Sequence, residues 1–382
     1  MIRRIKLLTL IILLLHCCTA ALVTTSAEIT NYIRVAIIQD TASLSLKTSG
    51  LFEITDASAR NILYRGKNLK TTVTAYKGGI LLAGKTFNLA KIVLSINEPD
   101  VAIINGRKFR GNIRFIKKDN LHLLVVNQIN LEDYIKGILY HESSHYWPIE
   151  ALKAQAIASR TYAVYQMQEN SAKDFDVTSD VYSQVYGGST SERYRTNKAV
   201  EETRGLIVTY QDKPIPAYFH ATCSGHTEDA SVLWKTDLAP LKGVACDFCK
   251  ESPHYNWHYV IFIGELREEL KNAGYNLGMI KEIQILGRNN SGRSTELNII
   301  TDRNELKIPA KDLRNIVGPN LIRSTKFNVS IEGQDAIFEG TGWGHGVGLC
   351  QWGAYFMAKQ GWDAKKILQY YYPGTDVKTL GF

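Results

Sequence analysis

The stretch LEDYIKGILYHESSHYWPIEALKAQAIASRTYAVYQMQ, residues 131–168, decides the fold because it contains two helical patterns with a polar break between them. The first pattern predicts a short helix with one apolar stripe. That stripe consists of Leu131, Ile135, Ile138 and Leu139. The second predicts a longer, alanine-rich helix in which Pro148 takes the first helical position and small side chains allow close packing. Its predicted buried face consists of Ile149, Leu152, Ala156 and Tyr162.

The polar break HESSHYWP, residues 141–148, contains the carboxylate of Glu142. Its neighbours include two histidines, two serines and Trp147, a combination that suits a polar pocket with an aromatic wall. Partial burial beside Trp147 would raise the pKa of Glu142, as a general acid requires. An N-capping or surface carboxylate is an equally good interpretation of this stretch alone.

Three segments carry a resemblance to a known family. Residues 131–164 resemble the hallmark segment of the SpoIID/LytB family, the stage II sporulation protein D group of bacterial peptidoglycan lytic enzymes. SQVYGG at 183–188 and GHGVGLCQWGA at 344–354 resemble further elements of that family, and the three segments follow its order. The resemblance extends from about Tyr32 to the C-terminus, and it implies that Glu142 matches the catalytic glutamate of the family.

The composition describes a folded protein that suits an anionic partner. Apolar residues make up 45% of the 382 and charged residues 21%, which excludes a largely disordered chain. The net charge of +8 fits a cell wall, a membrane surface or nucleic acid. Because no RNA- or DNA-reading motif and no concentrated basic block occurs, we do not expect nucleic acid to be the partner.

Residues 1–27 have the layout of a signal peptide or N-terminal anchor. Basic residues precede an apolar run from Leu7 to Leu15, and small residues follow it. The run is short for a membrane span, so we expect membrane attachment only if this segment is retained. The protein is therefore expected outside the cytoplasm: secreted, periplasmic or anchored to the cytoplasmic membrane.

Residues 28–128 are predicted to form a β-rich N-terminal region, because short β-branched runs with a period of two alternate there with turn residues. A structural role is the main interpretation, with a contribution to glycan binding as the alternative. The family resemblance assigns residues 129–382 to a mixed α/β, SpoIID-like catalytic domain with a central helix pair. The predicted fold class is therefore α+β.

Four of the six cysteines lie outside the leader, and their spacing suggests a metal site. An H-x-x-C sequence ending at Cys223 is followed after about twenty residues by C-x-x-C at Cys246 and Cys249, a pattern that suits tetrahedral zinc. Cys350 stands where the resembled family commonly has serine, which suggests that it joins them in a structural zinc site. His220 or His226 is the alternative ligand if Cys350 is free. A disulfide and a free thiol remain open alternatives.

The predicted substrate-binding residues lie in the family-like segments. Glycines on both sides of Trp343 and His345 allow the backbone to approach a ligand, although a bend selected for close packing has the same composition. Tyr186 precedes a Gly-Gly pair, and its ring suits a sugar face, but a packed aromatic loop is an equal alternative. His145, three residues after Glu142, is the fourth candidate.

These features predict an exported lytic transglycosylase. Such an enzyme cleaves the MurNAc-GlcNAc bond of peptidoglycan glycan strands and forms 1,6-anhydroMurNAc, with Glu142 as the general acid and base. The alternatives are a noncatalytic, wall-binding amidase enhancer that acts with other cell-wall hydrolases, and a zinc-dependent peptidoglycan amidase. The amidase is disfavoured because thiolate-rich zinc sites are usually structural and no H-E-x-x-H motif occurs.

Overall fold

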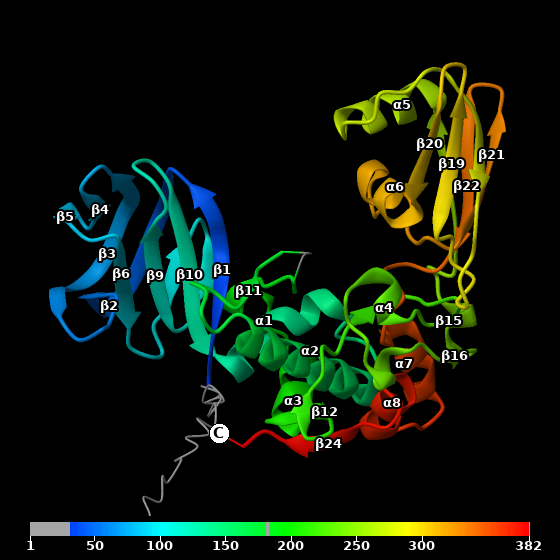
Figure 1. Cartoon of the computed structure of the whole chain (residues 1–382). Coiled ribbons are helices and arrows are strands. Elements are labelled where there is room, and N and C mark those ends of the chain that lie inside the picture. The colour runs from blue at the N-terminus through cyan, green and yellow to red at the C-terminus, as the bar shows by residue number, and fades with distance from the viewer. Residues whose placement is uncertain (1–30, 181–182, 382) are drawn as a thin grey trace, which may run out of the picture.

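The computed structural model describes residues 31–180 and 183–381, so the predicted leader lies outside the described residues. It has an α+β fold, as predicted. Figure 1 shows a twisted sheet on one side of a group of helices and a smaller α/β unit beyond the other side. No helix of the described residues has the length and apolar character needed to cross a bilayer.

The N-terminal sheet confirms the predicted β-rich region. Its strands are β1 (Tyr32–Thr41), β2 (Ser43–Asp56), β3 (Ile62–Tyr76), β4 (Gly79–Leu82), β5 (Lys85–Phe87), β6 (Lys91–Ile96), β7 (Ala102–Ile104), β8 (Arg107–Phe109), β9 (Asn112–Lys117), β10 (Leu123–Asn130) and β11 (Val177–Thr178). The order is β11-β1-β10-β9-β6-β2-β3-β4-β5, with β7 paired to β2 and β8. Alternate side chains of these strands fill one hydrophobic core, which also receives the apolar stripe of the first central helix.

The central layer is helical. It contains α1 (Leu131–Glu142), α2 (Ile149–Glu169), α3 (Tyr194–Glu202), α7 (Gln351–Lys359) and α8 (Ala364–Tyr371). Strand β10 leads directly into α1, where the side chain of Asn130 accepts a hydrogen bond from the Glu132 amide and so caps the helix. Because β10 is a central strand of the sheet, this direct connection fixes the position of α1.

Helix α2 differs from its prediction in two ways. Pro148 is the N-cap and has extended backbone angles, so the helix begins at Ile149. The helix is also buried around most of its circumference, because Leu152 and Ala156 face the N-terminal core while Ala154 and other residues face a second core. Alanines allow this close contact on both sides, so α2 separates two cores where the sequence predicted one buried face.

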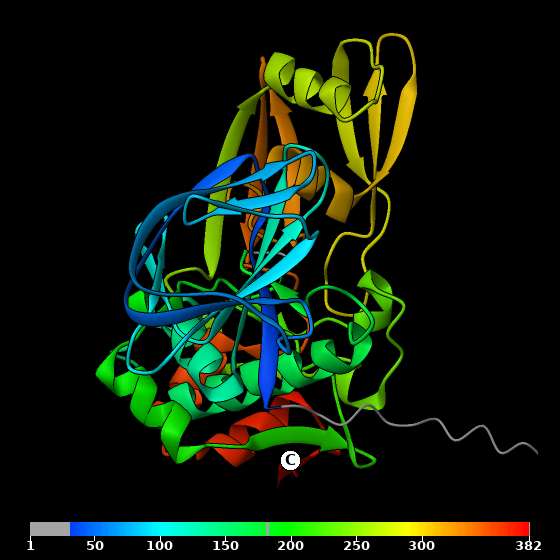
Figure 2. The ribbon, with the colours of Figure 1, turned by 90° about the vertical axis from the view of Figure 1, so that its left-hand side faces the viewer.

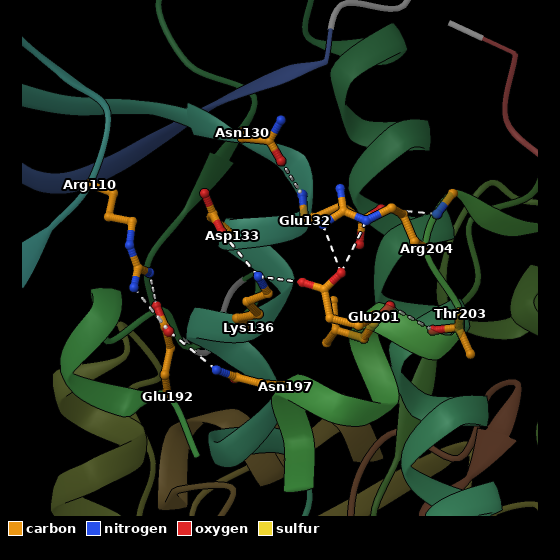
Figure 3. A network of polar contacts seen from close by, with 12 residues as sticks. Arg110, Asn130, Glu132, Asp133, Lys136, Glu192, Asn197, Glu201, Thr203 and Arg204 are labelled. Carbon is orange, nitrogen blue, oxygen red and sulfur yellow. Dashed lines mark hydrogen bonds and ion pairs between the residues drawn. The ribbon is translucent and has the colours of Figure 1, made fainter. Parts of the chain in front are cut away.

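The polar network in Figure 3 includes an ion pair that joins α1 to α3. Lys136 Nζ lies 3.4 Å from Asp133 Oδ1 and 2.6 Å from Glu201 Oε1 on α3. Arg204 also pairs with Glu201, at 2.8 Å between Nη2 and Oε2. These groups are partly exposed, so each pair contributes at most about 1 kcal/mol to stability, and of the three only Lys136–Glu201 joins α1 to α3.

A third unit is inserted between the central helices and α7. It consists of β17 (Asn256–Phe262), α5 (Ile263–Asn272), β18 (Ile280–Ile285), β19 (Glu296–Thr301), β20 (Glu305–Pro309), α6 (Ala310–Val317), β21 (Phe327–Glu332) and β22 (Asp335–Thr341). Two three-stranded antiparallel sheets and two helices enclose its own hydrophobic core. The views in Figures 1 and 2 place it above the central helices. The predicted turn NNSGR connects β18 to β19, where the Asn289 amide donates to the Arg293 carbonyl at 3.0 Å.

Short elements connect these units. They are η1 (Gly188–Ser191), β12 (Leu206–Tyr210), β13 (Lys213–Pro214), β14 (Phe219–His220), β15 (Gly225–His226), α4 (Ala230–Leu233), η2 (Ala239–Leu241), β16 (Ala245–Cys246), η3 (Phe248–Glu251), β23 (Leu349–Cys350) and β24 (Asp376–Thr379). Parallel pairing of β14 with β23 brings two family-like segments side by side, with Phe219 opposite Leu349 and His220 opposite Cys350. This small sheet builds the second core and one side of the site described next.

Candidate active site

Glu142 is the last residue of α1, at the predicted break between the two central helices. Its carbonyl accepts a hydrogen bond of 2.9 Å from Gln351 Nε2, at the start of α7. Gln351 also donates to Gln155 Oε1 on α2, at 3.3 Å. Side chains from α2 and α7 therefore fix the end of α1, and with it the backbone position of Glu142.

Burial raises the pKa of Glu142 to about 7, opposed only in part by a hydrogen bond with the Val185 backbone. At neutral pH a large fraction of this carboxyl is therefore protonated, so it can donate a proton and then accept one. The prediction that Trp147 forms the aromatic wall of the pocket around Glu142 is wrong. Trp147 packs against Trp352 and Tyr355, at ring-centroid distances of 5.1 and 5.3 Å, and it does not line the cavity around Glu142.

The carboxylate faces a cavity of about 870 Å³. Its walls come from the central helices, the loop at 183–185, the segments around β14, α4 and β23, and α6 with the loop before β21 in the inserted unit. The lining residues are Glu142, Tyr162, Gln166, Ser183, Val185, Tyr218, Phe219, His220, Ala221, Leu233, Trp234, Lys311, Asp312, Arg314, Asn315, Thr325, Trp343, Gly344, His345 and Gln351. Aromatic rings and hydrogen-bonding groups therefore occur together, as a sugar-binding cavity requires.

Trp343 and His345, two of the predicted substrate-binding residues, lie in this cavity with Glu142. The two glycines that flank His345 also allow close packing. A Cβ on Gly344, whose φ is +106°, would lie 2.8 Å from the Cβ of His220, and one on Gly346 would lie 2.5 Å from the Arg293 guanidinium. The two interpretations of this segment are therefore compatible, because the glycines pack against neighbours while the residues between them face the cavity.

The structure does not bring the other two candidates to the cavity. Tyr186 is buried in the N-terminal core, where its hydroxyl donates to Asn127 Oδ1 at 2.9 Å and its ring packs against Tyr134. His145 does not line the cavity, and its ring lies 5.6 Å from that of Tyr140 and 4.0 Å from that of Tyr146. Tyr186 thus has the role of a packed aromatic residue, and His145 belongs to a separate surface group.

The backbone holds the ring of His345 in place. Its Nδ1 accepts a hydrogen bond of 3.1 Å from the Val347 amide, and the ring also hydrogen-bonds to the Phe219 backbone. Burial, together with the positive charge of Arg314, lowers the pKa of His345 to about 3. The imidazole is therefore neutral at physiological pH, and it serves as an uncharged wall of the cavity.

The four predicted cysteine ligands lie together in the second core. The sulfur atoms of Cys223, Cys246, Cys249 and Cys350 all lie within 4.8 Å of one another, and all four residues are buried. The Cys223 and Cys249 sulfurs are 3.5 Å apart, so the thiols are free and not joined as a disulfide. Neither His220 nor His226 belongs to this group.

The geometry of this cluster fits a tetrahedral metal ion. Four thiolates at zinc–sulfur distances of about 2.3 Å would place their sulfur atoms about 3.8 Å apart, within the observed range. The amides of Cys223 and Gly353 donate to the Cys350 sulfur at 3.3 and 3.4 Å, which stabilises negative charge there. Hydrogen bonds with the neighbouring thiols, that of Cys223 first, lower the pKa of Cys249, whereas burial and the neighbouring thiols raise the pKa of Cys350. Metal ligation requires deprotonation of all four thiols, so a bound ion would have to displace their protons.

Sequence reasoning missed several cavity residues. Tyr218 and Trp234 flank the histidine and cysteine motif, and aromatic residues so close to it in the sequence were an available signal. Lys311, Asp312 and Arg314 come from α6, to which the sequence assigned no chemistry. No local pattern marks these three, because only the packing of the inserted unit brings them opposite Glu142.

Comparisons with known proteins identify two family models that match parts of the chain. A family model described as "Stage II sporulation protein" matches residues 119–210, which include both central helices. A second model, described as a domain of unknown function, matches residues 241–348, which include the inserted unit.

Three relatives illustrate the range of similar proteins. An uncharacterized protein of Brachyspira hyodysenteriae is 35% identical over 352 residues, covering 91% of this chain and 93% of its own. The stage II sporulation protein D of Bacillus subtilis is 33% identical over 267 residues, covering 66% and 75%. A protein of the same organism named amidase enhancer is 26% identical over 289 residues, covering 63% and 40%.

Proposed function

The chain belongs to the stage II sporulation protein D family, and from this premise we propose that it is a lytic transglycosylase acting on peptidoglycan glycan strands. The observation that carries the proposal is Glu142, a carboxyl whose pKa is raised to about 7 in a cavity that it shares with Trp343 and His345. A cell-wall function also fits the relative named amidase enhancer.

The proposed reaction needs one acid. Protonated Glu142 donates its proton to the oxygen that links MurNAc to GlcNAc, and the bond from that oxygen to C1 of MurNAc breaks. The C6 hydroxyl oxygen of the same MurNAc attacks C1, and its proton passes to the Glu142 carboxylate. The products are 1,6-anhydroMurNAc and a GlcNAc hydroxyl, and Glu142 is again protonated. No water is consumed.

A second carboxylate, Asp312 on α6, also lines the cavity. Most glycosidases pair two carboxyl groups and use water, so Asp312 makes a hydrolase the competing mechanism. The two mechanisms differ in their products and in their dependence on Asp312. Hydrolysis leaves a reducing end and needs both carboxylates, whereas the proposed transglycosylase leaves an anhydro end and needs Glu142 alone.

We further propose that Cys223, Cys246, Cys249 and Cys350 hold a structural zinc ion. Four thiolates would fill a tetrahedral coordination shell, which leaves no position for substrate or a reactive water. This argues against the zinc-dependent amidase. The ion would join the loops after β14 and around η3 to the start of α7, which carries Gln351 and so supports Glu142.

The metal content of the purified protein tests this part. We expect about one zinc per chain, lost in Cys246→Ser together with thermal stability. The matched control is His226→Gln, since this histidine lies outside the sulfur cluster. Full zinc content in Cys246→Ser, or none in the unaltered protein, would contradict the proposed site.

Peptidoglycan lies outside the cytoplasmic membrane, so the proposal places the protein there as a secreted, periplasmic or anchored protein, with glycan strands as its substrate. Digestion of purified peptidoglycan followed by mass spectrometry tests the reaction. We expect anhydro-muramyl ends with the unaltered protein and with Asp312→Asn, and none with Glu142→Gln.

Other products identify the alternatives. Reducing ends that disappear in Asp312→Asn indicate a hydrolase. Stem peptides whose release a chelator abolishes indicate an amidase. No products, together with retained binding to peptidoglycan, indicate a wall-binding protein that acts with other cell-wall hydrolases.

A further inference from the structure

His220 has an unusual combination of burial and an unpartnered nitrogen. Its side chain is 4% exposed, and Nδ1 lies 3.1 Å from the Val347 carbonyl, so Nδ1 carries the hydrogen and donates it. The other nitrogen, Nε2, is buried without a hydrogen-bond partner among the described residues. A buried acceptor without a donor is costly, by about 1–3 kcal/mol. Because His220 lines the cavity, a bound ligand can supply the missing donor once a small side-chain shift uncovers Nε2.

The neighbouring His345 does not have this property. The two rings lie 5.7 Å apart in the same cavity, but His345 is held by the Val347 amide and the Phe219 backbone. Of this pair, only His220 has a nitrogen without a partner in the described part of the chain. His345, which the sequence pattern emphasised, therefore forms part of the cavity wall. The nitrogen that remains available as a hydrogen-bond acceptor belongs to His220.

Trp234 lies on the other side of His345. Its ring is stacked on that of Tyr218, with centroids 4.3 Å apart and planes at 27°, and it meets the edge of His345 at 5.1 Å. The residue is nevertheless 37% exposed, and it lines the cavity. One face of the indole is thus supported by Tyr218 while part of the side chain remains open to solvent. A supported, exposed indole is a suitable platform for the apolar face of a sugar ring.

We propose that Trp234 and His220 form a sugar-binding subsite of the cavity, in which the indole stacks on an N-acetylated sugar and His220 Nε2 accepts a hydrogen bond from a sugar hydroxyl or acetamido N–H. This inference rests on the proposed function, because it assigns the cavity to a glycan. It also gives His220 a role different from that of a metal ligand, in agreement with the all-cysteine composition of the sulfur cluster.

Equilibrium binding tests the subsite without relying on turnover. The probe is a soluble tetrasaccharide of alternating GlcNAc and MurNAc, titrated calorimetrically into the full protein carrying Glu142→Gln. In that background, we expect Trp234→Ala and His220→Phe each to raise Kd about tenfold, the effect of about one hydrogen bond or one ring contact. We expect His220→Gln to bind within about threefold of the background protein, because the glutamine oxygen can replace Nε2 as the acceptor.

The matched controls are Tyr194→Ala and His258→Phe, which change an exposed tyrosine and an exposed histidine outside the cavity. We expect both to bind like the Glu142→Gln protein. Zinc content is measured for every variant, and we expect His220→Phe to retain it. The subsite is refuted if Trp234→Ala and His220→Phe bind like the controls, or if His220→Phe loses its zinc.

The subsite and the proposed reaction fail in different experiments. If peptidoglycan digestion yields no anhydro ends but tetrasaccharide binding depends on Trp234 and His220, the reaction is wrong and the subsite stands. If anhydro ends form but these variants bind normally, the reaction stands and the subsite is wrong.

Discussion

Helix α1 carries a buried carboxyl group near its start, Glu132, and a half-buried one at its end, Glu142, and their environments are opposite. Glu132 accepts hydrogen bonds from Arg160 Nε and Nη2, at 2.9 and 2.7 Å, and from the Gly205 amide at 3.0 Å. Glu142 faces the cavity, and burial without a compensating positive charge raises its pKa to about 7. Within the described residues, Glu142 forms no ion pair.

In the proposed reaction, this difference separates a structural acid, Glu132, from a catalytic one, Glu142. A buried ion pair with complete hydrogen bonding joins α1 to α2, and the Arg160 guanidinium extends the link to the Leu206 and Val200 carbonyls. Such a pair uses its carboxylate to join three segments of the chain. The proposed chemistry therefore depends on the end of the helix where a partner is missing, while the partnered end keeps that helix in place.

The largest expected effect comes from removing the unpartnered acid. Glu142→Gln should lower the rate of anhydro-end formation by about 10²–10⁴-fold, because it removes the proton donor and acceptor. The rate is measured by mass spectrometry of peptidoglycan digests. The matched control, Glu268→Gln, changes an exposed carboxylate on α5 and should retain the full rate. Equal rates in the two variants would show that Glu142 is not the acid.

Removing the arginine that pairs with Glu132 should lower the stability of the protein. Arg160→Met leaves Glu132 buried and uncompensated, which should lower the free energy of unfolding by about 3–5 kcal/mol. Urea denaturation monitored by circular dichroism measures this change. Arg204→Met removes an arginine whose side chain is 57% exposed, and it should cost less than about 1 kcal/mol. A similar small loss for both variants would show that the Glu132–Arg160 pair contributes little.

The unpartnered acid should itself destabilise the protein at high pH. The folded-state pKa of Glu142, about 7, lies above its ordinary value of 4.5, so stability is lost as pH rises between these values. Glu142→Gln removes this loss and should raise the free energy of unfolding near pH 8 by up to about 3 kcal/mol. The gain should disappear below about pH 4.5. Denaturation curves at the two pH values provide the measurement, and a gain that is independent of pH would contradict this cause.

The smallest expected effect concerns the pH dependence of the reaction. Because Glu142 must be protonated to act as an acid, its raised pKa predicts that the rate falls as pH increases above about 7. The fall should approach about tenfold per pH unit. Rates of anhydro-end formation between neutral and mildly alkaline pH measure this limb. A rate that already falls at about pH 5 would indicate an acid with an ordinary pKa.

The predicted fold was mostly correct where local patterns and chain order coincide. The two central helices, the β-rich region and the turn at 289–293 have strong periodic or turn signals, and the structure contains all of them. The environment of α2 was less predictable. Its alanines allow close contact on any side, so the sequence did not show that cores on both sides bury it.

The candidate site was also predicted only in part from the sequence. Glu142, Trp343 and His345 stand in family-like segments, and the structure brings them to one cavity. Tyr186 stands in such a segment too, but it is buried in the N-terminal core, because a tyrosine beside two glycines is equally suited to packing.

By itself, the sequence determined which elements form and which residues have useful chemistry: a glutamate at a helix break, four cysteines, and a glycine-rich segment with Trp343 and His345. Only the tertiary structure decided the raised pKa of Glu142, the joining of the cysteines into one cluster, and the positions of His220 and Trp234 beside His345. The physical reason is that burial, sulfur–sulfur distances and unpartnered nitrogens depend on contacts between segments far apart in the chain. Local periodicity in the sequence does not predict those contacts.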